Sequence, residues 1–184
     1  MTGIKFRGHP VVRAMLGTAL AAMVRAPLGL RPPALWSGLK VGGTAAAVVA
    51  LGVAATTAVP KARTAMADRD LPDDAARWLA LEIPAGTVWA EETVFRGAVL
   101  GLAVRAVGPT GGRLLQAVLF GLWHIPDARI RGESIIGTVV VTGLAGWVFG
   151  WLAERSGSLL APALAHLAIN ESGAVAALAV NRGT

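Results

Sequence analysis

Two adjacent glutamates, Glu91 and Glu92, lie inside a stretch of the chain that otherwise reads as membrane-buried. The local sequence over residues 88–97 is Val-Trp-Ala-Glu-Glu-Thr-Val-Phe-Arg-Gly. A charged side chain at the centre of a bilayer costs roughly 2.5 to 3.5 kcal/mol on insertion scales. Two carboxylates in such a place therefore indicate a functional site, with partners that offset part of this cost.

The spacing of the next charge separates the two glutamates. Arg96 follows Glu92 by four residues, the distance at which Glu and Arg side chains meet on one helix face. We therefore predict a mainly structural pair of Glu92 and Arg96. Glu91 points about 100° further round the helix and has no partner nearby in the sequence. Glu91 is thus the candidate for a general base.

Two later apolar segments carry further polar pairs at helical spacing. Phe120 and His124 are four residues apart and share one helix face, and so do His166 and Asn170. Taken alone, each pair is more often a packing residue or a helix–helix hydrogen bond in a membrane protein. The His and Asn side chains also supply N–H donors, which are the groups that stabilise a developing oxyanion.

Taken together, the three segments favour a catalytic site. Lipid does not accept polar helix faces, so we expect these faces to converge in a polar cavity. A carboxylate and a histidine can orient and deprotonate water, and a histidine and an asparagine can hold a tetrahedral oxyanion. This set predicts peptide hydrolysis without a nucleophilic side chain. Two histidines and one glutamate are also the ligands of some catalytic zinc sites, so a metal held by Glu91, His124 and His166 is the alternative.

The composition indicates a membrane protein. The 184-residue chain is 54% hydrophobic and 15% charged, with a mean hydropathy of +0.60, whereas soluble domains carry about 25% charged residues. We therefore predict an all-α, polytopic transmembrane bundle of about five to six spans around a polar catalytic cavity. The chain has no cysteine, which excludes disulfides and thiolate metal sites.

Basic residues dominate the beginning of the chain. The net charge is +6, and residues 1–40 contain basic residues but no acidic one. These charges are scattered among apolar residues and no recognition module surrounds them, so they indicate positive-inside topology rather than nucleic-acid binding. The basic residues of this region are Lys5, Arg7, Arg13, Arg25, Arg31 and Lys40.

The chain divides into four predicted regions. Residues 1–40 form a basic region with a short apolar helix at 14–24, and residues 41–60 an accessory transmembrane helix ended by Pro60. Residues 61–77 form a polar loop, with Asp73 or Asp74 near the start of the next helix. Residues 78–180 form the catalytic core. Its predicted parts are a helix at 78–104 with a kink at Pro84, a turn at 105–113, a helix at 114–125 stopped near Pro126, a polar loop at 127–133, and spans at 135–153 and 159–180.

Counting Arg and Lys in the short loops gives a predicted orientation. It places the N-terminus, the turn at 105–113 and the turn at Arg155 on the cytoplasmic side. If the segment at 14–30 also crosses the membrane, the side of the N-terminus changes.

The motifs resemble those of a known family. Glu91-Glu92-x-x-x-Arg96, Phe120-x-x-x-His124 and His166-x-x-x-Asn170 occur in the order and helical placement found in the CPBP (CAAX prenyl protease and bacteriocin-processing, or Abi) intramembrane proteases. The resemblance covers about residues 78–175. It implies an all-helical membrane protease in which Glu91 and His124 activate the water and His166 and Asn170 form the oxyanion site. For this family, both a metalloprotease mechanism and a metal-independent glutamate mechanism have been argued.

These observations predict an intramembrane endopeptidase, in a bacterial cytoplasmic membrane, that cleaves a membrane-associated peptide or protein. No cofactor is required on this interpretation, and a divalent metal such as zinc is the alternative. The chain is shorter than the eukaryotic prenyl-protein processors, so a bacterial role in peptide maturation, self-immunity or membrane-protein turnover is at least as well supported as cleavage of a prenylated CAAX substrate. The competing functions are a non-catalytic peptide-binding or bacteriocin-immunity protein and, last, a proton pathway.

Overall fold

The computed structural model describes residues 8–182, and every regular element in that range is a helix. Residues 1–7, which include Lys5 and Arg7 of the predicted basic region, lie outside the described residues. In chain order the elements are α1 (Pro10–Met23), α2 (Ala34–Thr57), α3 (Pro60–Ala67), α4 (Ala75–Arg77), η1 (Trp78–Trp89), α5 (Ala90–Glu92), η2 (Thr93–Val99), α6 (Leu100–Trp123), α7 (Ile125–Arg131), α8 (Ile135–Ser156) and α9 (Leu160–Arg182).

Three of these helices are long and apolar enough to cross a membrane. They are α2, α8 and α9, with 24, 22 and 23 residues, and about 20 apolar residues are enough to span the hydrocarbon core. The prediction of an all-helical protein with helices long and apolar enough to span a membrane is thus confirmed, while the number of five to six spans stays a prediction.

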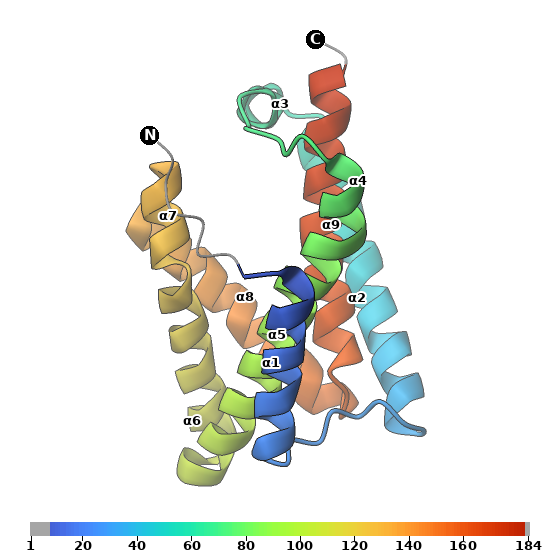
Figure 1. Cartoon of the computed structure of the whole chain (residues 1–184), viewed down its shortest axis with the longest axis vertical. Helices are drawn as coiled ribbons and strands as arrows, with labels where there is room; N and C mark the ends of the chain where they lie inside the picture. The colour runs from blue at the N-terminus through green and yellow to red at the C-terminus, as the bar shows by residue number, and fades with distance from the viewer. Residues whose placement is uncertain (1–7, 183–184) are drawn as a thin grey trace.

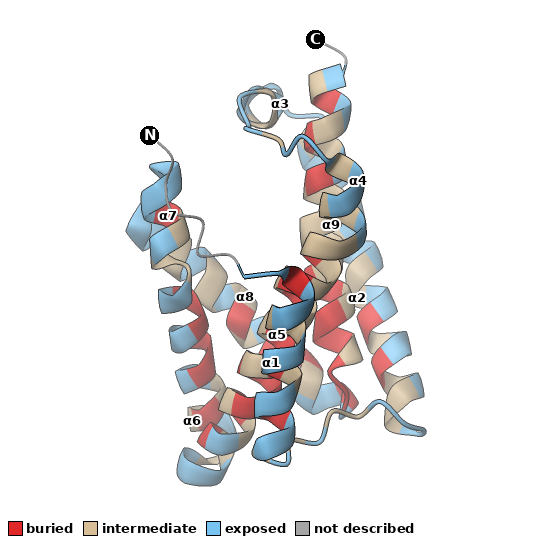
Figure 2. Ribbon diagram, viewed as in Figure 1, coloured by how far each residue is buried: buried red, intermediate tan, exposed pale blue. Residues whose placement is uncertain are grey.

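The helices pack in pairs. α2 runs along α9, α6 packs on α8, and α1 lies against η1, α5 and η2 (Figure 1). Buried residues gather on the faces that these helices turn toward one another, and α3 and α7 are largely exposed (Figure 2). The core cluster consists of Phe95, Phe120, Phe149, Leu152, Ala161 and Ala165.

One continuous helical run carries the two glutamates. It begins at Asp74, whose carboxylate accepts a hydrogen bond from the backbone N–H of Arg77 at 2.8 Å, which confirms the predicted acidic residue near the helix start. The run widens into π-type turns in η1 and η2, on either side of α5. Pro84 lies inside η1. Such wide turns are rare and frequently occur at functional sites.

Two predicted loops are wrong for the same physical reason. The polar loop predicted at 127–133 is largely the helix α7, and the loop predicted at 61–77 contains α3. Pro60 and Pro126 are each predicted to end the helix before them, but each lies in the first turn of a new helix. Proline fits there because the first N–H groups of a helix have no intrahelical partner.

The turn predicted at 105–113 is shorter than expected. Its non-helical backbone is confined to Val107 and Gly108, and Pro109 already belongs to the next helical stretch of α6. Gly108 has φ = +76°, which glycine adopts without the penalty that a Cβ atom imposes. This break lets α6 reverse direction and bring its second half to α8.

α1 packs closely on the glutamate helix. A Cβ atom at Gly17 would lie 2.8 Å from the carbonyl oxygen of Ala90 and would also clash with the hydroxyl of Thr93. One residue further, the Thr18 hydroxyl accepts a hydrogen bond from the indole N–H of Trp89 at 2.9 Å. The short first helix therefore braces the backbone directly beside Glu91 and Glu92.

Replacing Gly17 with Ala is expected to lower the free energy of unfolding by about 1 to 3 kcal/mol, because the added methyl group overpacks a backbone contact. Thermal unfolding of the purified protein in detergent measures the effect. Gly52→Ala in α2 is the matched control, since a Cβ atom there has nothing within 4 Å. Equal melting temperatures for Gly17→Ala and wild type would contradict this packing of α1.

Candidate active site

Glu92 is fully buried and bonded on two sides. Its Oε1 accepts a hydrogen bond from Arg96 Nη1 at 3.0 Å and from His166 Nδ1 at 2.8 Å. The other oxygen, Oε2, is buried and has no hydrogen-bond partner among the described residues. The side chains of Glu92 and Arg96 are both inaccessible to solvent. The predicted pair of Glu92 and Arg96 is confirmed, and in addition Glu92 joins the glutamate helix to α9.

Aromatic rings enclose Arg96. The central carbon of its guanidinium lies 4.1 Å from the ring centre of Phe120 and 4.9 Å from that of Phe149, both within the range of cation–π attraction. Phe149 lies on α8 and was not among the residues predicted from the sequence. An aromatic residue in an apolar span is an ordinary core residue by its pattern, so the sequence offered no signal for this role.

His166 is oriented by Glu92. A carboxylate only accepts, so His166 Nδ1 donates the bond to Glu92, and the ring stacks on Phe149 with centroids 5.0 Å apart. The other ring nitrogen, Nε2, lies 3.9 Å from Glu91 Oε2. In neutral His166 this nitrogen carries a lone pair, and in the imidazolium form it donates a hydrogen bond.

Glu91 has partners that come from other helices. Its Oε1 accepts a long hydrogen bond of 3.4 Å from the indole N–H of Trp123 on α6. Its Oε2 is buried and has no hydrogen-bond partner among the described residues, apart from the nearby His166 ring. A buried polar atom without a bonded partner needs one to offset its lost hydration, and water fits this role. Glu91 therefore keeps one oxygen available for a polar ligand.

His124 ends α6 close to the same cluster. Its Nδ1 lies 2.8 Å from the carbonyl oxygen of Phe120, and because a carbonyl only accepts, Nδ1 donates this bond. In the neutral ring, Nε2 is then left with a lone pair. The ring stands edge-on to Phe120 at 4.7 Å, and the adjacent Trp123 contacts Glu91.

Asn170 lies one helical turn after His166 on α9. Its side-chain N–H donates to the backbone carbonyl of His166 at 3.1 Å, which uses one of the two amide hydrogens. The fold thus brings Glu91, Glu92, Arg96, Phe120 and His166 into one connected cluster. His124 joins it through Phe120, and Asn170 through the backbone of α9.

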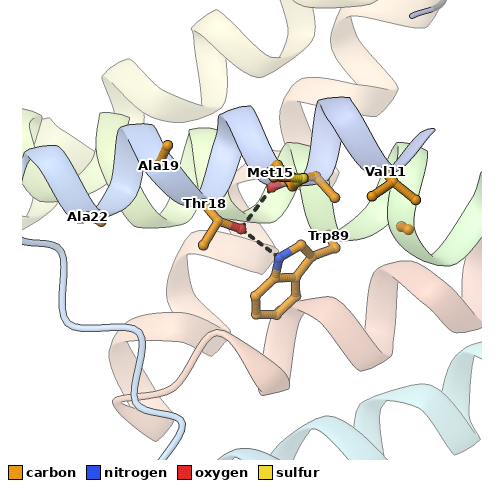
Figure 3. A pocket seen from close by; sticks show the side chains of 8 residues that line it. Val11, Met15, Thr18, Ala19, Ala22 and Trp89 are labelled. Carbon is orange, nitrogen blue, oxygen red and sulfur yellow. Dashed lines mark hydrogen bonds between the residues drawn. The ribbon is translucent and has the colours of Figure 1, made fainter. Parts of the chain in front are cut away.

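An apolar groove is separate from this cluster. It has a volume of about 470 Å³ between α1 and η1, and its lining includes Val11, Met15, Thr18 and Trp89 (Figure 3). None of the candidate catalytic side chains lines it. The predicted polar cavity around these side chains stays a prediction.

Among the described residues, no group of three or more His, Asp and Glu side chains is placed to hold a metal ion. The alternative ligand set of Glu91, His124 and His166 is therefore not assembled in this arrangement.

Residues 74–171, just over half of the chain, match the family model described as type II CAAX prenyl endopeptidase Rce1-like. The chain belongs to this family. The predicted resemblance is confirmed, and membership implies a CAAX-type endopeptidase. No curated protein and no solved structure matches the chain.

The limits of the Rce1-like segment coincide with features of the fold. It begins at Asp74, the cap of the glutamate helix, and ends one residue after Asn170. All seven residues singled out from the sequence lie inside it, whereas α1, α2 and α3 lie outside. The first two of these helices still pack directly against the core, α1 on the glutamate helix and α2 on α9.

Proposed function

We propose that the protein is an intramembrane endopeptidase that hydrolyses a peptide bond with a water molecule activated by Glu91 and His124. The observation that carries the proposal is the division of labour between the two glutamates. The Oε1 of Glu92 is bonded to Arg96 and His166, and the whole Glu92 side chain is inaccessible to solvent. The Glu91 side chain is 18% exposed, and its unbonded Oε2 lies 3.9 Å from His166 Nε2. A carboxylate held in this way is suited to accept a proton.

In the proposed reaction, Glu91 Oε2 takes a proton from the water while the lone pair on His124 Nε2 orients it. The water oxygen bonds to the carbonyl carbon of the substrate, and the carbonyl oxygen becomes an oxyanion. When the C–N bond breaks, the proton held by Glu91 passes to the leaving amine. General acid–base catalysis of this kind contributes about 10²- to 10⁴-fold in rate.

His166 and Asn170 are assigned to the oxyanion. Asn170 has a second amide hydrogen besides the one that bonds the His166 carbonyl. His166 donates from Nε2 in its imidazolium form, in which Nδ1 still bonds Glu92. Glu92 and Arg96 are positioning residues, because their ion pair fixes the ring of His166 without reaching the substrate. Donors held in place before the reaction stabilise the developing charge without reorganising.

We further propose that the protein is integral to a bacterial cytoplasmic membrane and takes a membrane-associated peptide or protein as substrate. The three long apolar helices and the Rce1-like family support an integral membrane protein that takes a peptide or protein substrate. A nucleic-acid partner is not proposed.

A cleavage assay on the purified full chain tests the proposal. Membrane peptides with and without a prenylated CAAX end are incubated with the protein, and products are identified by mass spectrometry. We expect cleavage that persists in EDTA, because the described residues do not assemble three metal ligands. Loss of cleavage in EDTA and its return with zinc would contradict the metal-independent mechanism. Peptide binding without cleavage, unchanged in Glu91→Gln, would instead favour the non-catalytic binding or immunity protein.

A further inference from the structure

A second groove lies between α2 and α8, away from the candidate active site. Its volume is about 310 Å³, which is within the range of small-ligand sites. Its polar and aromatic lining consists of Lys40, Thr44, Trp151 and Arg155, and its apolar lining is Val41, Ala45 and Leu152. Because α2 lies outside the Rce1-like segment, this groove combines a family helix with a helix that the family model does not cover.

The two cations of the groove have no counter-ion in the described part of the chain. Lys40 and Arg155 are exposed, come from different helices and line the same groove. Glu154, next to Arg155 in the sequence, is bonded to Arg113 at 2.7 Å instead. Two like charges on one groove repel each other, and a bound anion removes this repulsion.

Basic residues gather at the end of the molecule where the groove opens. At this end the α1–α2 loop meets the α8–α9 turn, where Leu159 N–H donates to Leu28 O at 3.0 Å, and Arg105 donates to Val24 O at 3.2 Å (Figure 1). The segments at this end, residues 24–45 and 99–115, contain no acidic residue. The positive-inside rule directs such an end to the cytoplasmic leaflet, which carries anionic lipids.

We propose that this groove binds an anionic phospholipid of the cytoplasmic leaflet. Lys40 and Arg155 hold the phosphate of the headgroup, for which Arg provides a planar pair of donors. Trp151 lies at the depth of the interface, where its amphipathic ring is favoured. One acyl chain covers the apolar surface of Val41, Ala45 and Leu152. The lipid thereby bridges α2 and α8.

Native mass spectrometry of the purified full chain tests this proposal. The protein is released from micelles that contain equal amounts of phosphatidylglycerol and the zwitterionic phosphatidylcholine. We expect wild type to retain one phosphatidylglycerol with a roughly ten- to thirtyfold preference, since each basic residue at a membrane surface contributes about a few-fold in affinity. The double variant Lys40→Gln/Arg155→Gln is expected to lose this preference.

The matched control is Arg25→Gln/Arg31→Gln, which removes the same charge from the same end but outside the groove lining. It is expected to keep the preference. An unchanged preference in the groove variant, or an equal loss in the control, would overturn the proposal. Displacement of the lipid by millimolar inorganic phosphate would overturn it as well, because the site would then take a free anion. The melting temperature of each variant in lipid-free detergent shows whether it is folded. The single variants Lys40→Gln and Arg155→Gln provide a second measurement, because each is expected to lose part of the preference for phosphatidylglycerol.

Discussion

Replacing Glu91 with Gln is expected to lower the rate of peptide cleavage by about 10²- to 10⁴-fold, which is the usual contribution of a general base. Gln has the shape of Glu and its carbonyl oxygen can still accept the hydrogen bond from Trp123, but it cannot take a proton from water. The melting temperature is expected to stay close to that of wild type, because the bond to Trp123 is long and the side chain is 18% exposed.

The initial rate of cleavage of a membrane peptide by the purified variant measures this effect. Glu82→Gln is the matched control, because Glu82 lies on the same helical run and pairs with Arg77 at the protein surface at 3.3 Å. The control is expected to cleave at the wild-type rate. Wild-type cleavage by Glu91→Gln would refute the assignment of Glu91 as the base, whatever its effect on stability.

Replacing Arg96 with Met is expected to lower the free energy of unfolding by about 3 to 5 kcal/mol, the cost of breaking a buried ion pair from one side. The change leaves the Glu92 carboxylate buried without its cation. It also removes the guanidinium that lies between Phe120 and Phe149. Equilibrium unfolding in mixed detergent, at increasing SDS, measures the loss.

Two further variants test whether the loss of stability comes from the buried ion pair. Arg77→Met removes an arginine whose ion pair is exposed, and such pairs contribute about 0 to 1 kcal/mol. The double variant Glu92→Gln/Arg96→Met is expected to recover part of the stability, since no unpaired charge stays buried. If Arg96→Met had the same free energy of unfolding as wild type, the buried position of this pair would be contradicted.

The results for Glu91→Gln and Arg96→Met together distinguish the role of Glu91 from that of its neighbour Glu92. Replacing Glu91 is expected to change mainly the rate of peptide cleavage. Breaking the Glu92–Arg96 pair is expected to change mainly the free energy of unfolding. This contrast follows from the partners of each carboxylate: Glu92 has two donors at 2.8 and 3.0 Å, whereas Glu91 has one at 3.4 Å. A purely structural role for both glutamates would predict similar losses of stability from either one.

Two helices outside the Rce1-like segment, α1 and α2, contact different parts of it. α1 braces the glutamate helix through Gly17 and through the bond from Trp89 to Thr18. α2 packs along α9, the helix that carries His166 and Asn170, and forms one wall of the proposed lipid groove. Both helices therefore support the position of the candidate catalytic side chains, which belong to the family segment.

Two of the long helices and one ion pair were predictable from the sequence, because each depends on residues that are close together in the chain. Hydropathy predicted the spans at 135–153 and 159–180, which correspond to α8 and α9. Four-residue spacing predicted the pair of Glu92 and Arg96. The errors at Pro60 and Pro126 are also local, because a proline after a helix is compatible with a stop and with the first turn of another helix.

Hydropathy and the spacing of residues along single helices were sufficient to predict the membrane class, most of the helical segments and the order of the motifs. The packing of the helices was needed to show that His166 bonds Glu92, that Trp123 bonds Glu91, and that Phe149 lies against Arg96. The two hydrogen bonds join residues 74 and 32 positions apart. No local periodicity specifies which helix faces will meet, because that choice depends on how all the helices pack together.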